Sequence, residues 1–523
     1  MSRSTAPRRG AVSSPHPMAT EAGLKVLRAG GNAAEAAVAT GAALAVLCPH
    51  FCGLGGDGVW MLGDDAGMRL CILGLGHAGE AVPMTGTPVP QRGPGAMLTT
   101  AGLIPSWEAL LEVGRTAWNG DAPLAPLLSD AVTWAEQGIA VTASHRFWLS
   151  FRAAEFGDWP GFARSFLPAG RMPDIGERFR QPGLAAILTI LQDEGLDSFR
   201  TGTAARRVAA GLSAAGAPLT AADLAATRAQ VVTPLAMPVA GWTLFAPPAP
   251  TQGATTLTIM ALLDRLGAAG LDPDGAGALH LRVEAVKQAF ALRGAIADPA
   301  LHPVPGLPCA AALDRMAADV PRRRATPWPH PFAPADTVYL AVTDAAGHHV
   351  SALQSTYFDW GSGVPVGDTG ILWNNRGAAF GPSGSGVNGL APGARPFHTL
   401  NPGMAFGPAG EALLYGTQGA DGQPQTLAVL LDRMLFHGEP PERALAAPRF
   451  LLGRTFSDSE DTLKVEESAG RPVLEALRRM GHPVEPLPPL SPLAGQAGAI
   501  LVDARGQCHA AHDPRGEGTA GLT

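Results

Sequence analysis

A proline-rich segment divides the chain and limits what can be built on either side of it. Between Leu301 and Ala335, prolines stand at positions 303, 305, 308, 321, 327, 329, 331 and 334. Because proline lacks an amide hydrogen and fixes its φ angle, such a run does not continue a helix or a central strand. We interpret the segment as an inter-domain linker, or as an exposed tail that leads into a processing site, and both interpretations can hold.

Length and charge narrow the class of protein. The 523 residues are too many for one compact core of ordinary size, so two domains or one large layered domain are expected. The hydrophobic fraction of 46% and the charged fraction of 16% indicate a globular chain. The net charge is −7, and the densest basic cluster, residues 321–324, is too short to favour a nucleic-acid partner.

The cysteines and the apolar runs bear on cofactors and location. Five scattered cysteines argue against a disulfide framework. Cys48 and Cys52 flank an apolar segment without a second ligand pair, so we expect buried small side chains there, and nothing demands a metal or an organic cofactor. No signal-like apolar core follows Met1, and the run from Ala36 to Cys48 is too short to span a bilayer. We therefore expect a cytoplasmic protein without a membrane partner.

The part of the chain before the proline-rich segment is rich in helix signals. Residues 19–29 are helix-like, and Asn32 with Glu35 forms a plausible capping box for a buried alanine-rich helix that ends near residue 47. A glycine loop at 52–58 precedes expected strands at 59–62 and 69–75. Residues 100–300 show mostly helical patterns broken by glycine and proline.

The part after it begins with a hairpin pattern. Residues 338–344 and 348–355 are expected to pair across a turn at 345–347, where His348 and His349 should face solvent. A second glycine loop runs from Gly416 to Gly422, and Pro424 suits the first turn of a helix to about residue 436. A late strand is expected at 496–503. Sets of strands with helices on both sides indicate stacked sheets covered by helices.

Motifs spread over nearly the whole length carry a family resemblance. They are residues 14–19, 21–24, 30–33, 53–57, 336–337, 361–363, 370–375, 416–425, 447–450 and 513–515. In this order and spacing the chain resembles the gamma-glutamyltranspeptidase family of N-terminal-nucleophile hydrolases. The Asn375-Arg376-Gly377-Ala378 run is similar to the branch that holds oxamate amidohydrolase and cephalosporin-acylase-like enzymes.

The resemblance implies an α+β fold, a four-layer αββα sandwich. It also implies a precursor that cuts itself before Thr337, giving a heterodimer of a large subunit, 1–336, and a small subunit, 337–523. The freed Thr337 would then attack an amide carbonyl and form an acyl-enzyme ester. Its own α-amino group, with an ordinary pKa of about 7.7–8.0, would serve as the base.

The resemblance also assigns roles to particular positions. Ser355 falls where the family places a hydroxyl that hydrogen-bonds the nucleophile. Gly419 and Ala420 fall where two glycines donate backbone N–H groups to the tetrahedral oxyanion. Ala420 departs from glycine, which matters only if its φ must be positive. His398 and Thr399 replace a serine pair that holds the substrate carboxylate.

Further departures concern the substrate head group. The first strand region, residues 74–80, lacks the arginine that grips the glutamyl α-carboxylate, and alanines replace the aspartate expected after Asn375. Tyr357 stands where an asparagine is usual. Arg376 could grip a carboxylate from the other side with bidentate geometry. A site that lacks both the arginine and the aspartate should discriminate against a zwitterionic glutamyl group.

Three functions stay open at this point. The first is an amidohydrolase with an N-terminal threonine, acting on an oxamate-like or acyl amide. The second is a gamma-glutamyl transferase or glutathione hydrolase, and the third is an unprocessed, inactive homologue that serves as a binding protein. The expected partners are a small-molecule amide and the two subunits of the same precursor.

Overall fold

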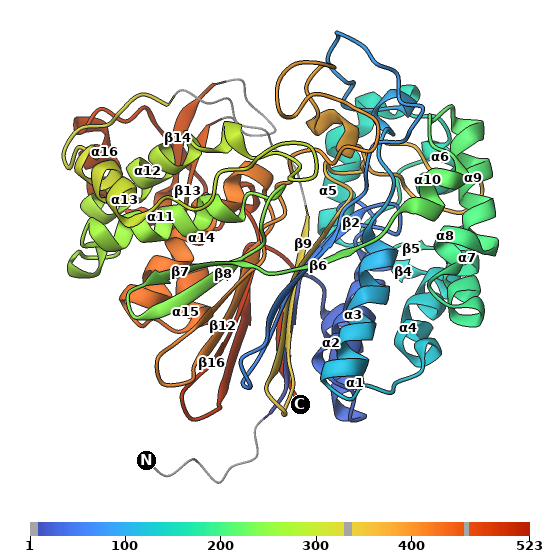
Figure 1. The fold of residues 1–523 in the computed structure, drawn as a ribbon, viewed down its shortest axis with the longest axis horizontal. Helices are drawn as coiled ribbons and strands as arrows, with labels where there is room; N and C mark the ends of the chain where they lie inside the picture. The colour runs from blue at the N-terminus through green and yellow to red at the C-terminus, as the bar shows by residue number, and fades with distance from the viewer. Residues whose placement is uncertain (1–8, 329–336, 454–459) are drawn as a thin grey trace.

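Two large β-sheets stack face to face between two layers of helices (Figure 1). The computed structural model describes residues 9–328, 337–453 and 460–523. All strand pairs in these two sheets are antiparallel. The four-layer sandwich expected from the resemblance is confirmed.

The first sheet has seven strands, and the segment that follows Thr337 lies in its middle. Its order is β18 (Thr519–Leu522), β1 (Ala11–Ser14), β9 (Val338–Thr343), β10 (His348–Ser355), β2 (Asp57–Asp64), β3 (Arg69–Gly74) and β6 (Gln230–Val232). The second sheet has six strands, in the order β17 (Cys508–His512), β16 (Ala497–Val502), β12 (Ala412–Thr417), β11 (Gly403–Phe406), β8 (Trp242–Ala246) and β7 (Leu235–Val239). Residues from both sides of position 337 therefore build both sheets.

Strand β9 shows how the alternation of side chains holds the layers together. Tyr339 and Ala341 pack into the core between the two sheets, with residues such as Met404 and Leu414 of the second sheet. Val338 and Leu340 point to the other face and pack against the helical layer. Because successive side chains of a strand face opposite ways, this one strand joins two cores.

The helices form two groups that cover opposite faces of the sandwich (Figure 1). Beside the seven-stranded sheet lie α1 (Pro17–Arg28), α2 (Ala33–Leu47), α3 (Leu103–Ala117), α4 (Leu124–Gln137), α5 (Ala143–Arg152), α6 (Phe162–Phe166), α7 (Pro182–Glu194), α8 (Ser198–Thr201), α9 (Thr203–Ala215) and α10 (Ala221–Ala226). Beside the six-stranded sheet lie α11 (Gly253–Arg265), α12 (Ala276–Phe290), α13 (Ala310–Ala318), α14 (Gln423–Leu431), α15 (Pro441–Ala446) and α16 (Arg471–Arg479). Small sheets complete the fold, β4 (Ile139–Ala140) with β5 (Arg178–Phe179), and β13 (Phe450–Gly453) with β14 (Thr462–Glu466) and β15 (Val484–Leu487).

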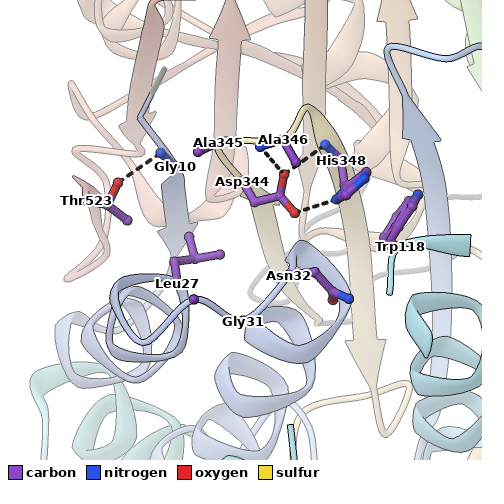
Figure 2. Close-up of a pocket in the computed structure, with 11 residues that line it drawn as sticks. Gly10, Leu27, Gly31, Asn32, Trp118, Asp344, Ala345, Ala346, His348 and Thr523 are labelled. Atoms are coloured by element: carbon purple, nitrogen blue, oxygen red, sulfur yellow. Dashed lines mark hydrogen bonds and ion pairs between the residues drawn. The ribbon is translucent and has the colours of Figure 1, made fainter. Parts of the chain in front are cut away.

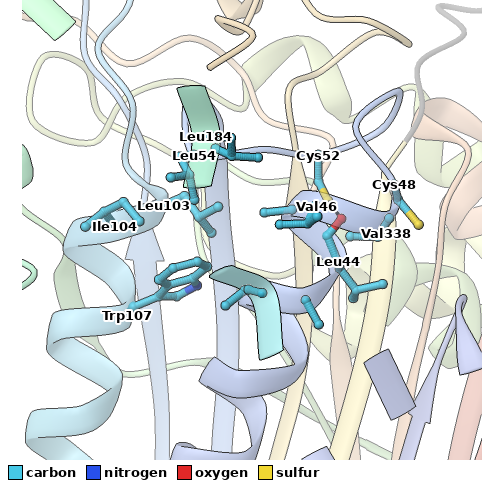
Figure 3. Packing of buried hydrophobic residues seen from close by; sticks show 14 of the residues in the cluster. Leu44, Val46, Cys48, Cys52, Leu54, Leu103, Ile104, Trp107, Leu184 and Val338 are labelled. Atoms are coloured by element: carbon cyan, nitrogen blue, oxygen red, sulfur yellow. Dashed lines mark hydrogen bonds between the residues drawn. The ribbon is translucent and has the colours of Figure 1, made fainter. Parts of the chain in front are cut away.

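The buried helix α2 begins as its sequence predicts. The Asn32 side chain accepts hydrogen bonds from the amides of Ala34 and Glu35, and the Glu35 carboxylate accepts one from the Asn32 amide, which completes the capping box. Every residue of α2 is buried. Cys48 and Cys52 at its end are free thiols packed among Leu44, Val46 and other apolar side chains (Figure 3), so their predicted burial is confirmed.

The structure differs from the sequence predictions in three places. The region 100–300 contains strands β6, β7 and β8, which its helical patterns did not indicate. His349 does not face solvent, because strand β10 turns it inward, where its Nδ1 lies 2.8 Å from Thr343 Oγ1. The proline-rich segment is not a plain linker, because helix α13 forms inside it.

Within the three described stretches, no helix combines the length and the apolar character needed to cross a membrane. The cytoplasmic location stays a prediction.

Candidate active site

Thr337 lies at the head of β9 and is buried at the end of the first sheet. The register of the β9–β10 hairpin pairs Val338 with Gln354, which brings Thr337 beside Ser355. The Thr337 hydroxyl donates a hydrogen bond to Ser355 Oγ at 3.1 Å. The predicted partnership of the two hydroxyl groups therefore exists in the structure. Asp336, on the other side of the predicted scission, lies outside the described residues.

Ser355 also fixes the loop that follows it. Its Oγ accepts a hydrogen bond of 2.8 Å from the amide of Tyr357, a residue with the unusual φ of +84°. A residue other than glycine is strained at such a positive φ angle, so the surrounding contacts must hold Tyr357 there. In this conformation the centroid of the Tyr357 ring lies 4.0 Å from the Arg376 guanidinium carbon.

The loop from Gly416 to Gly422 contains the predicted oxyanion donors. Gly419 has a φ of +110° and Ala420 a φ of +44°. The condition that the sequence left open is thus met, because Ala420 adopts the left-handed conformation that a glycine would enter without strain. Asp421 forms an ion pair with Arg293, which braces the loop from the side of α12.

Arg376 is the most unusual group in the site. Its side chain is completely buried, and none of its guanidinium nitrogens has a hydrogen-bond partner among the residues that the structure describes. The nearest opposite charge is Asp57, whose Oδ2 lies 3.8 Å from Arg376 Nε. Burial lowers the pKa of Arg376, and the charges of Asp57 and Tyr357 oppose that shift. A buried cation so poorly satisfied is a ready site for an anion.

Asp57 is only half engaged by the protein. Its Oδ1 accepts hydrogen bonds from the amides of Gly76 at 2.8 Å and Gly102 at 3.1 Å, while its Oδ2 has no such partner within the described stretches. Burial raises the pKa of Asp57 to about 6, against the opposing effect of Arg376. The carboxyl group can therefore change its charge in a mildly acidic solution.

His398 and Thr399 lie on a segment that pairs with the chain before α11. The His398 amide donates to Pro250 O at 2.8 Å, and the imidazole is buried with neither ring nitrogen bonded to any described residue. Burial, with the charges of Arg376 and Arg395, holds the His398 pKa well below its usual value, so the ring is neutral. A neutral imidazole offers one donor and one acceptor to a ligand.

Asn375 has another task in this structure. Its Oδ1 accepts from the Phe358 amide at 3.1 Å, and its Nδ2 donates to Gln91 O at 2.8 Å. The side chain thus holds the loop that carries Tyr357. Of the predicted substrate-binding side chains, Tyr357, Arg376 and His398 are linked by charge and contact.

The site residues predicted from the sequence did not include Asp57, Arg293 or Gln252, which the structure places in this neighbourhood. Gln252 is the least visible of the three. Its Nε2 donates to Ala420 O at 2.8 Å and to Thr399 O at 2.6 Å. A glutamine in a Pro-Thr-Gln-Gly sequence carries no local signature of such a contact. Only the approach of Ala420 and Thr399, distant in the chain, makes it visible.

The opposite end of the β9–β10 hairpin offers a contrast (Figure 2). A cavity of about 250 Å³ lies there, lined by Asn32, Trp118, Asp344 and His348 among others. Asp344 Oδ2 accepts from His348 Nδ1 at 2.7 Å and from the Ala33 amide at 2.9 Å, and the His348 ring stacks on Trp118. Its main polar groups are satisfied by the protein, so we assign it no ligand.

One group of side chains has metal-ligand types in close reach. Ligand atoms of His280, Glu284 and His482 lie within 4.8 Å of one another. However, His280 Nδ1 and His482 Nε2 are hydrogen-bonded at 2.8 Å, and Lys287 Nζ donates to Glu284 at 2.7 Å. An ammonium group at the carboxylate opposes a cation. The arrangement is that of a hydrogen-bond network.

Comparisons with known proteins show the family to which the chain belongs. The family model described as gamma-glutamyltranspeptidase matches residues 19–523. The oxamate amidohydrolase proenzyme of Klebsiella pneumoniae is 42% identical over 98% of this chain and 98% of its own length, and the glutathione hydrolase-like YwrD proenzyme of Bacillus subtilis is 35% identical over 97% of each. The crystal structure of cephalosporin acylase from Bacillus halodurans superposes with a TM-score of 0.88 at 28% identity, covering 100% of this chain and 97% of that one. The chain therefore belongs to the gamma-glutamyltranspeptidase family, and it is an enzyme with the N-terminal-nucleophile hydrolase fold.

Proposed function

We propose that this chain is a proenzyme that cuts itself before Thr337 and then hydrolyses a small amide that bears a carboxylate, with oxamate as the first candidate. The cut would give a large subunit, 1–336, and a small subunit, 337–523. Both segments contribute strands to each sheet, so the two pieces would stay together as one heterodimer. The oxamate amidohydrolase named among the relatives makes oxamate the natural first substrate to try.

The chemistry follows from an alcohol and an amine on one residue. The Thr337 hydroxyl attacks the amide carbon while the α-amino group takes its proton, and Ser355, at 3.1 Å, orients the hydroxyl. The backbone N–H groups of Gly419 and Ala420 would donate to the oxyanion, each worth about 3–4 kcal/mol of barrier. The carbon–nitrogen bond then breaks, the amine proton passes to the leaving nitrogen, and water hydrolyses the ester.

The observation that carries the substrate proposal is the buried Arg376 guanidinium without a hydrogen-bonded partner among the described residues. A carboxylate accepts bidentate hydrogen bonds from such a group, and it would supply the negative charge that Asp57, at 3.8 Å, supplies only in part. The neutral His398 ring, whose pKa is lowered in part by the charge of Arg376, can add a further donor. Asn375 supports this surface through the Phe358 loop.

Maturation is tested by the intact mass of purified protein. We expect the wild type to give two masses that correspond to a break between residues 336 and 337, and Thr337→Ala to give one uncut chain. Thr343→Ala, at a buried threonine on the other end of β9, is the matched control and should still be cut. A wild type that stays uncut and hydrolyses no amide after long incubation would instead identify an inactive binding protein.

Substrate choice is tested by two release assays on the cleaved enzyme. We expect ammonia from oxamate and little p-nitroaniline from a gamma-glutamyl anilide, because the site lacks the arginine and the aspartate that would hold the zwitterionic head group. The reverse preference would assign the chain to the gamma-glutamyl transferases and glutathione hydrolases of the family.

A further inference from the structure

Gln252 links the predicted oxyanion loop to the segment that contains His398 and Thr399. It is fully buried and stands directly before helix α11, where its side chain does not cap the helix. Its Nε2 donates to Ala420 O and to Thr399 O, and its backbone amide donates to His398 O at 3.0 Å. One side chain therefore fixes the distance between these two parts of the site.

These contacts identify which atom of the Gln252 side-chain amide is the nitrogen and which is the oxygen. Carbonyl oxygens only accept hydrogen bonds, so the atom that lies 2.8 Å and 2.6 Å from two of them must be the nitrogen. The Oε1 oxygen consequently points away from both carbonyl groups. It is buried and has no hydrogen-bond partner in the part of the chain that the structure describes.

An unpaired buried amide oxygen requires a donor, because leaving such an acceptor unsatisfied is costly. The neighbouring groups limit what the donor can be. The backbone amide of His398 already donates to Pro250 O, so it is not that donor. A substrate amide brings both a carbonyl for the oxyanion loop and an N–H group, so it can satisfy the loop and the free oxygen together.

We infer that Gln252 determines specificity by accepting a hydrogen bond from the N–H of the scissile amide at Oε1 while its Nε2 holds Ala420 and Thr399 in place. This inference rests on the proposed function and adds a substrate feature to it. The site selects a carbonyl group that carries N–H, such as a primary or an N-monosubstituted amide, over an ester of the same acid.

The test compares the hydrolysis of two substrates by the wild type and by a set of Gln252 variants. N-methyloxamate and monomethyl oxalate share the acyl group and the size of the leaving group, and differ by an N–H in place of an oxygen. Both give oxalate on hydrolysis, so one product assay yields kcat/KM for each. We expect Gln252→Met to lower the amide-to-ester ratio of kcat/KM by about tenfold to a hundredfold.

Gln252→Glu separates the two roles of the side chain. It keeps an acceptor oxygen but loses the donor to Ala420 and Thr399, so both rates should fall while the amide-to-ester ratio stays near the wild-type value. Gln252→Lys keeps donors and removes the acceptor. It should reproduce the ratio of Gln252→Met, and it replaces that variant if the methionine prevents folding.

Gln425 provides a matched control beside the same loop. Its Nε2 donates to Asp421 O at 3.2 Å, but its Oε1 already accepts from the Leu452 amide at 2.7 Å. Gln425→Met should therefore lower both rates and leave the amide-to-ester ratio unchanged. A change of the ratio in Gln425→Met equal to that in Gln252→Met would show that loop disorder, and not Oε1, sets the preference.

The outcomes distinguish this inference from the proposed function. An unchanged ratio in Gln252→Met and Gln252→Lys, with oxamate hydrolysed by the wild type, overturns the assignment of Gln252 alone. A wild type that hydrolyses neither oxalyl compound but cleaves the gamma-glutamyl anilide overturns the oxamate proposal. The same comparison is then run on the N-methyl amide and methyl ester of the gamma-glutamyl group, where the expected ratio change is the same.

Discussion

Arg376 and Arg515 both have completely buried side chains, but the protein treats them in opposite ways. Arg515 donates from Nε to Glu466 Oε1 at 2.8 Å and from Nη1 to Leu445 O at 2.7 Å, and it also pairs with Asp513. Arg376 has one carboxylate at 3.8 Å and no hydrogen-bond partner among the described residues.

In our proposal this difference separates a structural cation, Arg515, from a cation that binds substrate, Arg376. The partners of Arg515 compensate for the loss of its hydration, and although burial lowers its pKa, hydrogen bonds to Glu466 and the charge of Asp513 leave that pKa raised. Arg376 lacks hydrogen-bond partners of this kind among the described residues, and a carboxylate ligand would supply them. The same sequence signal, an arginine in a family motif, therefore has a different meaning in each place.

The largest expected effect follows from removing the binding cation. Arg376→Met should lower kcat/KM for oxamate by about three to four orders of magnitude, because the substrate carboxylate loses its charged partner. The melting temperature should fall only a little, because Arg376 makes no hydrogen bond to the described residues and the Asp57 carboxyl group left behind keeps its two backbone donors. Steady-state kinetics and calorimetry measure the two effects.

The comparison would fail if Arg376→Met unfolded the protein or left the kinetics intact. Either result would place Arg376 with the structural arginines. Arg395→Met is a useful control, because Arg395 is a nearby charge that also influences His398 but does not share the contact of Arg376 with Tyr357. It should have the smaller kinetic effect.

Removing the structural cation should give the reverse pattern. Arg515→Met leaves Glu466 and Asp513 buried without their partner, so we expect a loss of about 3–5 kcal/mol in unfolding free energy. Denaturant titration measures this loss. The molecules that stay folded should keep their KM for oxamate, and a raised KM with unchanged stability would remove the distinction between the two arginines.

The charge of Asp57 should change how strongly Arg376 binds the substrate carboxylate. The Asp57 pKa is raised from 3.8 to about 6, so the group is neutral below this pH and anionic above it. As pH rises through about 6, Asp57 competes with the substrate for Arg376, and KM for oxamate should rise by about tenfold. Asp57→Asn should remove this step from the pH profile of KM. A step that persists in Asp57→Asn would assign it to another group.

The smallest expected effect concerns the strained alanine of the oxyanion loop. Ala420→Gly should raise the stability by about 1 kcal/mol, because glycine enters the left-handed region without strain. The N–H group is kept, so kcat should change little. Thermal melting checks the gain, and a destabilised Ala420→Gly would show that the lost methyl contacts outweigh the relief of strain.

Sequence reasoning succeeded where the determining contacts are local or belong to a long motif. The capping box of Asn32 and Glu35 lies within one helical turn, and the hairpin after Thr337 follows from alternation and a glycine turn. The match of motifs in order indicated the sandwich, which no single segment could indicate.

Sequence reasoning failed where contacts between distant parts of the chain determine the local structure. Strands β7 and β8 are short and only partly buried, and Pro238 interrupts the strand signal, so the pairing of β8 with β7 and β11 was not visible. His349 was expected at an exposed turn, although the ring of Phe406 from the second sheet packs against it. Gln252 and the unsatisfied state of Arg376 depend on segments more than a hundred residues away.

The most direct test of the binding cation compares two substrates that differ in one charge. Oxamate and its neutral diamide, oxamide, present the same carbonyl to Thr337, but only oxamate has a carboxylate for Arg376. The kcat/KM of the cleaved wild type should favour oxamate by about three orders of magnitude, and that preference should vanish in Arg376→Met. Equal rates for the two substrates in the wild type, or an unchanged preference in the variant, would contradict the role of Arg376 as the group that binds the substrate carboxylate.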